Sequence, residues 1–183
     1  MVVFKNENQE IGYPYDRDVY FSYLDDDLPS VKWYGYSLQI QLDFSQNISY
    51  DLLKSVFQKI IIENDTGDEW LVNHDDKHMP WFFDKKDNLP LLRSLFEGNG
   101  ILNSFKGVLS CFKEDVIFLA KDLVSYPFLL SYKNIDISHS KQVLILKLTS
   151  HLTIDVLSTD EEKIQEIISY DFLQGFKKVK YRD

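Results

Sequence analysis

Residues 143–157 decide the fold class, and they read Val143-Leu144-Ile145-Leu146-Lys147-Leu148-Thr149-Ser150-His151-Leu152-Thr153-Ile154-Asp155-Val156-Leu157. The apolar run at 143–148 predicts a strand that is buried on both faces and therefore central in a sheet. Residues 152–157 predict its hairpin partner across Ser150-His151, although this pair is not the favoured Asn-Gly turn. Together the two segments indicate an antiparallel pair at the centre of the sheet.

Further strands are predicted upstream of this hairpin. Residues 31–44 alternate between apolar and polar side chains, which indicates a strand with one packed face and one wet face. Shorter strands are predicted at residues 18–24, 70–73 and 105–111. Residues 25–30 would form the turn between the strands at 18–24 and 31–44, because they contain a proline that ends pairing.

Apolar residues at helical spacing predict helices at 49–63, 89–97 and 113–126, and Pro127 is expected to close the third. Two overlapping capping-box patterns in residues 158–162 predict a last helix directly after them.

The basic tail at 176–183 is expected to fray or to dock on the acidic half of the chain. Strands and helices interleave without a regular βαβ alternation. We therefore predict one α+β domain over residues 1–183, with a mostly antiparallel sheet of about 5–6 strands packed against about 3–4 helices.

The composition is that of an ordinary globular chain. Of its 183 residues, 44% are hydrophobic and 27% are charged, which argues against disorder. Cys111 is the only cysteine, so we expect a buried structural thiol and no intrachain disulfide. The first ten residues hold no long apolar stretch, and no window approaches the ~18 apolar residues of a membrane span. We therefore expect a cytoplasmic protein.

The negative charge is concentrated in residues 1–90. This half holds 17 of the 29 acidic residues and 8 of the 20 basic ones, so it carries the whole net charge of −9 and residues 91–183 are neutral. Such a field repels nucleic acid and anionic membranes and attracts basic partners. It is also what keeps an ordinary acidic protein soluble.

Asp65-Thr66-Gly67 spells the triplet of the aspartic proteases, in which two carboxylates share one proton. Here the triplet follows an amphipathic helix instead of an apolar strand, and the sequence holds no second copy. We interpret it as the turn that ends the helix.

Histidines supply two further candidates for chemistry. His74 and His78 lie four residues apart with carboxylates between them, a spacing that suits zinc on a helix, but no helical pattern covers this segment. His139 and His151 flank the central strand, where each could pair with Asp136, Asp155 or Cys111. No glycine-rich phosphate loop or dinucleotide fingerprint is present. We predict no catalytic residue, no metal and no cofactor.

Residues 68–84 are the least regular part of the chain and mix aromatic rings with carboxylates. Rings supply desolvated area, and carboxylates steer and select a basic partner. The other interpretation is that the rings plug the sheet as part of the core. The candidate partner-binding residues lie in this segment and in the acidic run before residue 31, and they are Asp25, Asp26, Asp27, Asp68, Glu69, Trp70, Asp75, Asp76, Trp81 and Phe82.

In size, acidity, lone cysteine and lack of catalytic motifs, the chain resembles the immunity proteins that neutralise bacterial nuclease toxins. No motif matches them residue by residue. The resemblance implies a non-enzymatic acidic binding protein that inhibits a basic macromolecule by covering its active site, with an association that slows as salt rises. Two alternatives stay open: a structural or regulatory subunit, and a small metal-dependent hydrolase that uses His74 and His78.

Overall fold

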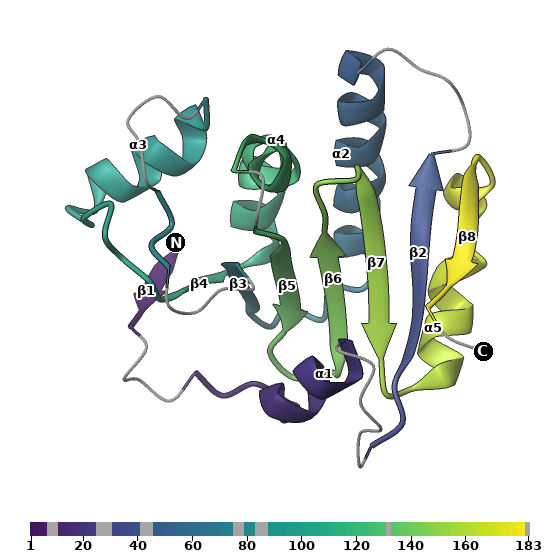
Figure 1. The fold of residues 1–183 in the computed structure, drawn as a ribbon. Helices are drawn as coiled ribbons and strands as arrows, with labels where there is room; N and C mark the ends of the chain where they lie inside the picture. Colours follow the sequence, from purple (N-terminus) through teal and green to yellow (C-terminus); the bar gives the residue numbers. More distant parts are fainter. Residues whose placement is uncertain are drawn as a thin grey trace.

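The structure is a computed structural model that describes residues 1–6, 11–24, 31–40, 46–74, 79–82, 88–130 and 133–181. These residues form one antiparallel sheet of eight strands with helices on both of its faces (Figure 1). In spatial order across the sheet, the strands are β1 (Val3–Lys5), β4 (Val108–Cys111), β3 (Trp70–His74), β5 (Ile135–His139), β6 (Leu144–Leu148), β7 (Thr153–Ser158), β2 (Tyr34–Ile40) and β8 (Phe176–Lys180).

The helices divide unequally between the two faces. They are α1 (Arg17–Leu24), α2 (Gln46–Glu63), α3 (Pro90–Gly98), α4 (Lys113–Leu129) and α5 (Glu161–Ile168), with a 3₁₀ turn at Asp171–Leu173. The main core lies between the sheet and α2, α4 and α5, and α3 packs against α4. On the opposite face, α1 lies across the lower ends of the central strands (Figure 1).

The predicted central hairpin is confirmed. Strand β6 is buried along its whole length, and β7 pairs with it from Leu144↔Ser158 to Leu148↔Ile154. The connection is a four-residue loop in which Leu152 adopts a φ of 57°. The sequence pattern therefore located both strands correctly, and a longer turn took the place of the tight one.

The predicted helices are present with shifted ends. Helix α2 buries the expected stripe, which includes Leu53, Phe57 and Ile60. Helix α5 begins at a true N-cap, because Asp160 Oδ1 accepts hydrogen bonds from the backbone N–H groups of Glu162 and Lys163 at 3.0 and 3.2 Å. None of the helices within the described residues is long and apolar enough to cross a membrane.

The strand predicted at residues 18–24 is wrong, because this segment forms α1. Asp16 Oδ1 caps the helix by accepting from the N–H groups of Asp18 and Val19 at 2.8 and 3.3 Å. Tyr20 and Tyr23, three residues apart, then face the sheet and are buried. The alternation of apolar and polar residues at 18–24 is short, and the cap at Asp16 favours a helix over a strand. The turn predicted at 25–30 lies outside the described residues.

Pro127 does not end α4, which continues to Leu129 with Pro127 inside its last turn. Leu130 N–H donates to Tyr126 O at 3.0 Å, so the helix survives the loss of the proline donor.

The basic tail was predicted to fray or to dock on the acidic half, and it docks there, because it forms strand β8 against β2 of the N-terminal half. This strand pairs with β2 at the edge of the sheet, and Lys177 and Lys178 are exposed there. Lysines on an edge strand discourage pairing with a second chain.

The predicted fold class is confirmed, but the numbers of elements were too low. Strands β1, β5 and β8 and helix α1 account for the excess over about 5–6 strands and about 3–4 helices. Strand β2 covers only residues 34–40 of the predicted strand at 31–44, and residues 41–45 lie outside the described residues.

Candidate functional site

A row of polar side chains crosses the centre of the sheet on the face that carries α1. In register across five neighbouring strands, it consists of Asn73, Asp136, Lys147, Asp155 and Ser37. Side chains alternate between the faces of a strand, so the apolar neighbours of these residues point into the main core. The sheet thus has an apolar face under α2 and α4 and a polar row on the other side.

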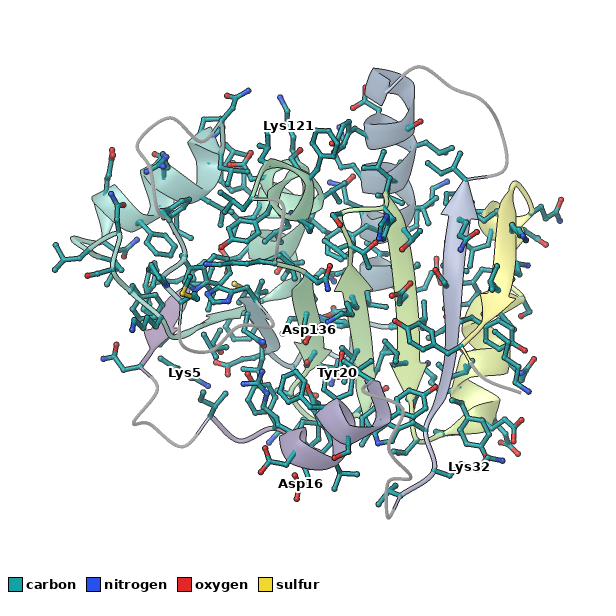
Figure 2. All side chains as sticks on the ribbon, in the orientation of Figure 1. Lys5, Asp16, Tyr20, Lys32, Lys121 and Asp136 are labelled. Atoms are coloured by element: carbon teal, nitrogen blue, oxygen red, sulfur yellow. The ribbon has the colours of Figure 1, made fainter. Side chains whose placement is uncertain are left out.

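Asp136 and Lys147 form a buried ion pair within this row. Lys147 Nζ lies 3.2 Å from Asp136 Oδ1, and the two side chains are 7% and 1% exposed. Tyr20 of α1 donates its hydroxyl hydrogen to the same oxygen at 3.3 Å, and Figure 2 labels Tyr20 next to Asp136. Within the described residues, Asp136 Oδ2 has no hydrogen-bond partner. A buried carboxylate oxygen in that state retains unused capacity to accept.

Asp155 is the second carboxylate of the row, and hydroxyl groups surround it. Tyr181 donates to Asp155 Oδ2 at 2.7 Å, and Thr153 donates to Oδ1 at 3.3 Å. Burial raises the pKa of the Asp155 carboxyl above its ordinary value, while hydrogen bonds from Ser37 and Tyr181 and the charge of Lys147 act in the opposite direction. The raised pKa reflects a buried charge that its neighbours compensate only in part.

Tyrosines from the N-terminal segment cover one end of the polar row. Tyr13 donates to Asn73 Oδ1 at 3.0 Å, and the hydroxyl oxygens of Tyr15 and Ser138 lie 2.8 Å apart. Burial raises the pKa of Tyr13 to about 12, so its hydroxyl remains a donor at neutral pH. Tyr15 packs with Tyr20, Tyr23 and Trp33 in a second, smaller core on the α1 face, and the Tyr13 ring lies against Tyr15.

Tyr181 follows β8 and joins this second core to Asp155. Its backbone N–H donates to Gly35 O at 2.9 Å, and its ring lies over Gly35, where an added Cβ would come within 3.3 Å of the tyrosine Cβ. The absence of a side chain at Gly35 therefore gives the Tyr181 ring the room to reach Asp155.

A cavity of about 590 Å³ opens beside Asp155, on the part of this face that α1 does not cover. Strands β2, β6, β7 and β8 and the loop between β6 and β7 form its walls. The described residues that line it are Ser37, Gln39, Asn134, Lys147, Thr149, Ser150, His151, Thr153, Asp155, Val179, Lys180 and Tyr181. Nearly all of these side chains are polar, which distinguishes the cavity from a packing defect in an apolar core.

The buried charged groups of the polar row do not balance, and of these Lys147 and Asp155 line the cavity. As whole residues, Asp136, Lys147 and Asp155 are each at most 5% exposed, and they supply two carboxylates to one ammonium group. Lys180 and His151 also line the cavity, but both are exposed to solvent at its rim. Water and salt screen exposed charges far more than buried ones. Lys180 and His151 therefore offset the negative charge of the buried carboxylates only weakly.

Three aromatic candidates for partner binding lie in the core instead of at the surface. Trp70 and Trp81 are 0% exposed and Phe82 is 2% exposed. Trp81 is further fixed by its indole N–H, which donates to Gly107 O at 2.8 Å, and by its carbonyl, which accepts from the Tyr126 hydroxyl at 2.6 Å. The interpretation that these rings plug the sheet therefore holds for all three, and in this structure they offer a partner almost no exposed area.

Two acidic candidates lie just before β3 in the chain, and each contacts a neighbouring side chain. Lys5 Nζ lies 3.4 Å from Glu69 Oε2, and Asp68 Oδ2 accepts from the Thr66 hydroxyl at 2.7 Å. The remaining five candidates lie outside the described residues, and they are Asp25, Asp26, Asp27, Asp75 and Asp76.

The residues around Thr66 form a turn, as predicted. Helix α2 ends at Glu63, and Gly67 adopts a φ of +84°. Thr66 Oγ1 lies 2.9 Å from His139 Nε2, while His139 Nδ1 accepts from the backbone N–H groups of Lys141 and Gln142 at 3.0 and 3.1 Å. Since Nδ1 accepts two bonds, the imidazole is neutral with its proton on Nε2.

Of the other histidine candidates, His151 lines the cavity beside Asp155, whereas His139 and His74 lie at the ends of β5 and β3. Trp70 separates Cys111 from His139, because it pairs with one on each side in the sheet. Burial raises the pKa of the Cys111 thiol, so the predicted structural cysteine is confirmed. His74 is buried with its ring against Trp81, and His78 lies outside the described residues. In the described part of the chain, no three His, Cys, Asp or Glu side chains gather as metal ligands.

The polar row was missed as a site from the sequence, although a signal for it exists. Asp136, Lys147 and Asp155 each stand between apolar residues in the middle of a predicted or actual strand. Charged residues are rarely buried unless they are paired, so one such residue in each of three strands indicates that they meet. The sequence alone suggests Asp136 and Asp155 only as partners of His139 and His151.

Comparisons of the chain with protein families, with curated proteins and with solved structures found no match. A function can therefore be argued only from the residues and the geometry described above.

Proposed function

We propose that this chain is a non-enzymatic binding protein that inhibits a basic macromolecule by covering its active site, as an immunity protein covers a toxin. The observation that supports this most directly is the polar row, whose two buried carboxylates share one ammonium group beneath an open cavity. A basic partner would supply the missing positive charge. The net charge of −9 would speed the encounter.

The docking face in this proposal is the part of the sheet beside α1 that includes the cavity. Its rim carries the partly exposed side chains of Ser37, Gln39 and Ser150, which suit the polar rim of a protein interface. Asp68 and Glu69, just before β3, would attract a basic partner during its approach. The acidic sequence at 25–27 would add to this attraction. The buried rings of Trp70, Trp81 and Phe82 would stabilise the core and would not contact the partner.

The test uses the protein encoded beside this chain, since inhibitors of this kind are made together with their targets. Its binding to the purified chain is measured on a biosensor at several salt concentrations. We expect a basic neighbour that binds, with an association rate constant that falls as salt rises. A neighbour that is not basic or does not bind contradicts the proposal. Binding that is indifferent to salt contradicts its electrostatic part.

A further inference from the structure

The cavity beside Asp155 has the chemistry of a receptor for one cationic side chain, and we propose that it takes an arginine of the partner. This inference rests on the proposed function, because it names the group by which the basic partner would be held. It concerns the cavity alone, however, and a small probe tests it without the partner.

The first argument is charge. Lys147 forms its ion pair with Asp136 at 3.2 Å, and among the described residues Asp155 has no cation of its own at ion-pair distance, although Lys147 lies on the neighbouring strand. Asp155 is only 4% exposed, so water compensates its charge poorly. A guanidinium group in the cavity would restore one cation for each carboxylate.

The second argument is the lining of the cavity. A guanidinium presents five N–H donors in a planar fork and accepts nothing, so it requires several acceptors around one carboxylate. Beside Asp155, the cavity walls offer amide and hydroxyl oxygens from Gln39, Thr149 and Thr153. A volume of about 590 Å³ is more than a single side chain fills, which leaves room for water around the head group.

The third argument is access. The cavity lies next to the edge strand β8 and away from α1, so an approaching protein meets no described helix over it (Figure 1). The ring of Tyr181 forms one wall and is held by its bond to Asp155 at 2.7 Å. Arginine stacks favourably on aromatic rings, so this wall suits the same guest.

The experiment is a titration of the purified chain with methylguanidinium, followed by the amide signals of an NMR spectrum, with sodium acetate as the anionic counterpart. We expect saturable shifts that gather around Gln39, Thr153 and Asp155, and no saturable shifts with acetate. Asp155→Asn, which keeps the shape of the side chain, is expected to weaken methylguanidinium at least tenfold. Gln39→Trp, which fills the cavity from its partly exposed rim and leaves the buried row intact, is expected to abolish the shifts.

Several results would overturn the proposal. Saturable binding of acetate would make the cavity an anion site centred on Lys147. If methylguanidinium still binds both variants, its binding site lies outside the cavity. If it does not bind the wild-type chain, the cavity is not a receptor for a guanidinium group. If methylguanidinium fails while the basic neighbour still binds, the cavity proposal falls and the proposed function stands.

Discussion

At the scale of single residues, buried polar side chains fix this structure by accepting hydrogen bonds from backbone N–H groups. Asp122 of α4 and His139 of β5 do this at two separate places. Asp122 accepts from residues 30 and 31 positions away, so the local sequence does not predict its role, whereas His139 accepts from the turn that directly follows it. Substitutions at both positions therefore test the packing directly.

Asp122 caps a helix other than its own. Its Oδ2 accepts from the N–H groups of Leu91 and Leu92 at 2.7 and 3.0 Å, at the start of α3, where Leu89 supplies no side-chain cap. Asp122→Ala is expected to lower the free energy of unfolding by about 1–3 kcal/mol, because these donors lose their partner.

Denaturant unfolding measures this effect, with Ser125→Ala on the same helix as the control, since the Ser125 hydroxyl only bonds to Lys121 O and is exposed. An equal loss in both variants would show that Asp122 is not a cap.

His139 predicts a dependence of stability on pH. Burial lowers the pKa of its imidazole, against the opposing charges of Asp68 and Asp65. A base whose pKa is lower in the folded state binds its proton more readily when unfolded. Its contribution is therefore fully present above the ordinary histidine pKa of about 6.5 and is lost as the pH falls below it.

The test compares the wild type with His139→Asn, whose side-chain oxygen replaces the Nδ1 acceptor without titrating. The stability advantage of the wild type is expected to shrink as the pH is lowered from 7.5 through 6.5 and below. An advantage that stays constant or grows at lower pH would refute the assigned protonation state.

At the scale of elements, the sequence predicts the helices and strands that have their own apolar periodicity. It does not predict the strands that form only through long-range pairing. The β6–β7 hairpin, α2 and α5 each carry their own pattern of apolar residues or caps, and all three are present. In the sequence, β8 looks like a basic tail, because its strand character comes from pairing with β2, which lies about 140 residues earlier in the chain. Strand β1 was missed for the same reason, because its strand character comes from pairing with β4.

The candidate site divides in the same way. The sequence placed rings and carboxylates together at residues 68–84, but composition does not tell an exposed ring from a buried one, and Trp81 is buried. The polar row was out of reach for a different reason. Its members come from five strands, and only the register of the sheet aligns Asp136, Lys147 and Asp155.

Gly107 supports a prediction at this scale, because β1 passes directly over it. An added Cβ would lie 2.0 Å from Lys5 O and 2.5 Å from the Phe105 ring. Gly107→Ala is expected to cost about 1–3 kcal/mol of stability and to loosen the β1–β4 pairing. Hydrogen exchange at Val3–Lys5 measures that loosening.

Gly98→Ala in α3 is the matched control, because nothing lies within 4 Å of its added Cβ. It is expected to leave the stability unchanged or to raise it by up to about 1 kcal/mol, as alanine favours a helix over glycine. Protection of β1 that is unchanged in Gly107→Ala would contradict the close approach seen here.

At the scale of the whole molecule, the sheet separates the main core from the face that we propose for recognition. One face packs against α2, α4 and α5 and forms the main core, while the other carries the polar row, the α1 layer and the cavity. A substitution at the rim of the cavity is therefore expected to change binding with little effect on folding. A substitution at an exposed position of the opposite helix layer is expected to change neither binding nor folding.

The most direct test of this account is the dissociation constant of the basic neighbouring protein for three forms of the chain: wild type, Gln39→Trp and Gln165→Trp. Gln39 lines the cavity and Gln165 is exposed on α5, so the two variants introduce the same ring on opposite faces of the sheet. We predict that Gln39→Trp binds at least tenfold more weakly, about 1.4 kcal/mol, and that Gln165→Trp binds like the wild type. Equal binding by all three forms, or a loss confined to Gln165→Trp, would contradict the polar face as the recognition surface.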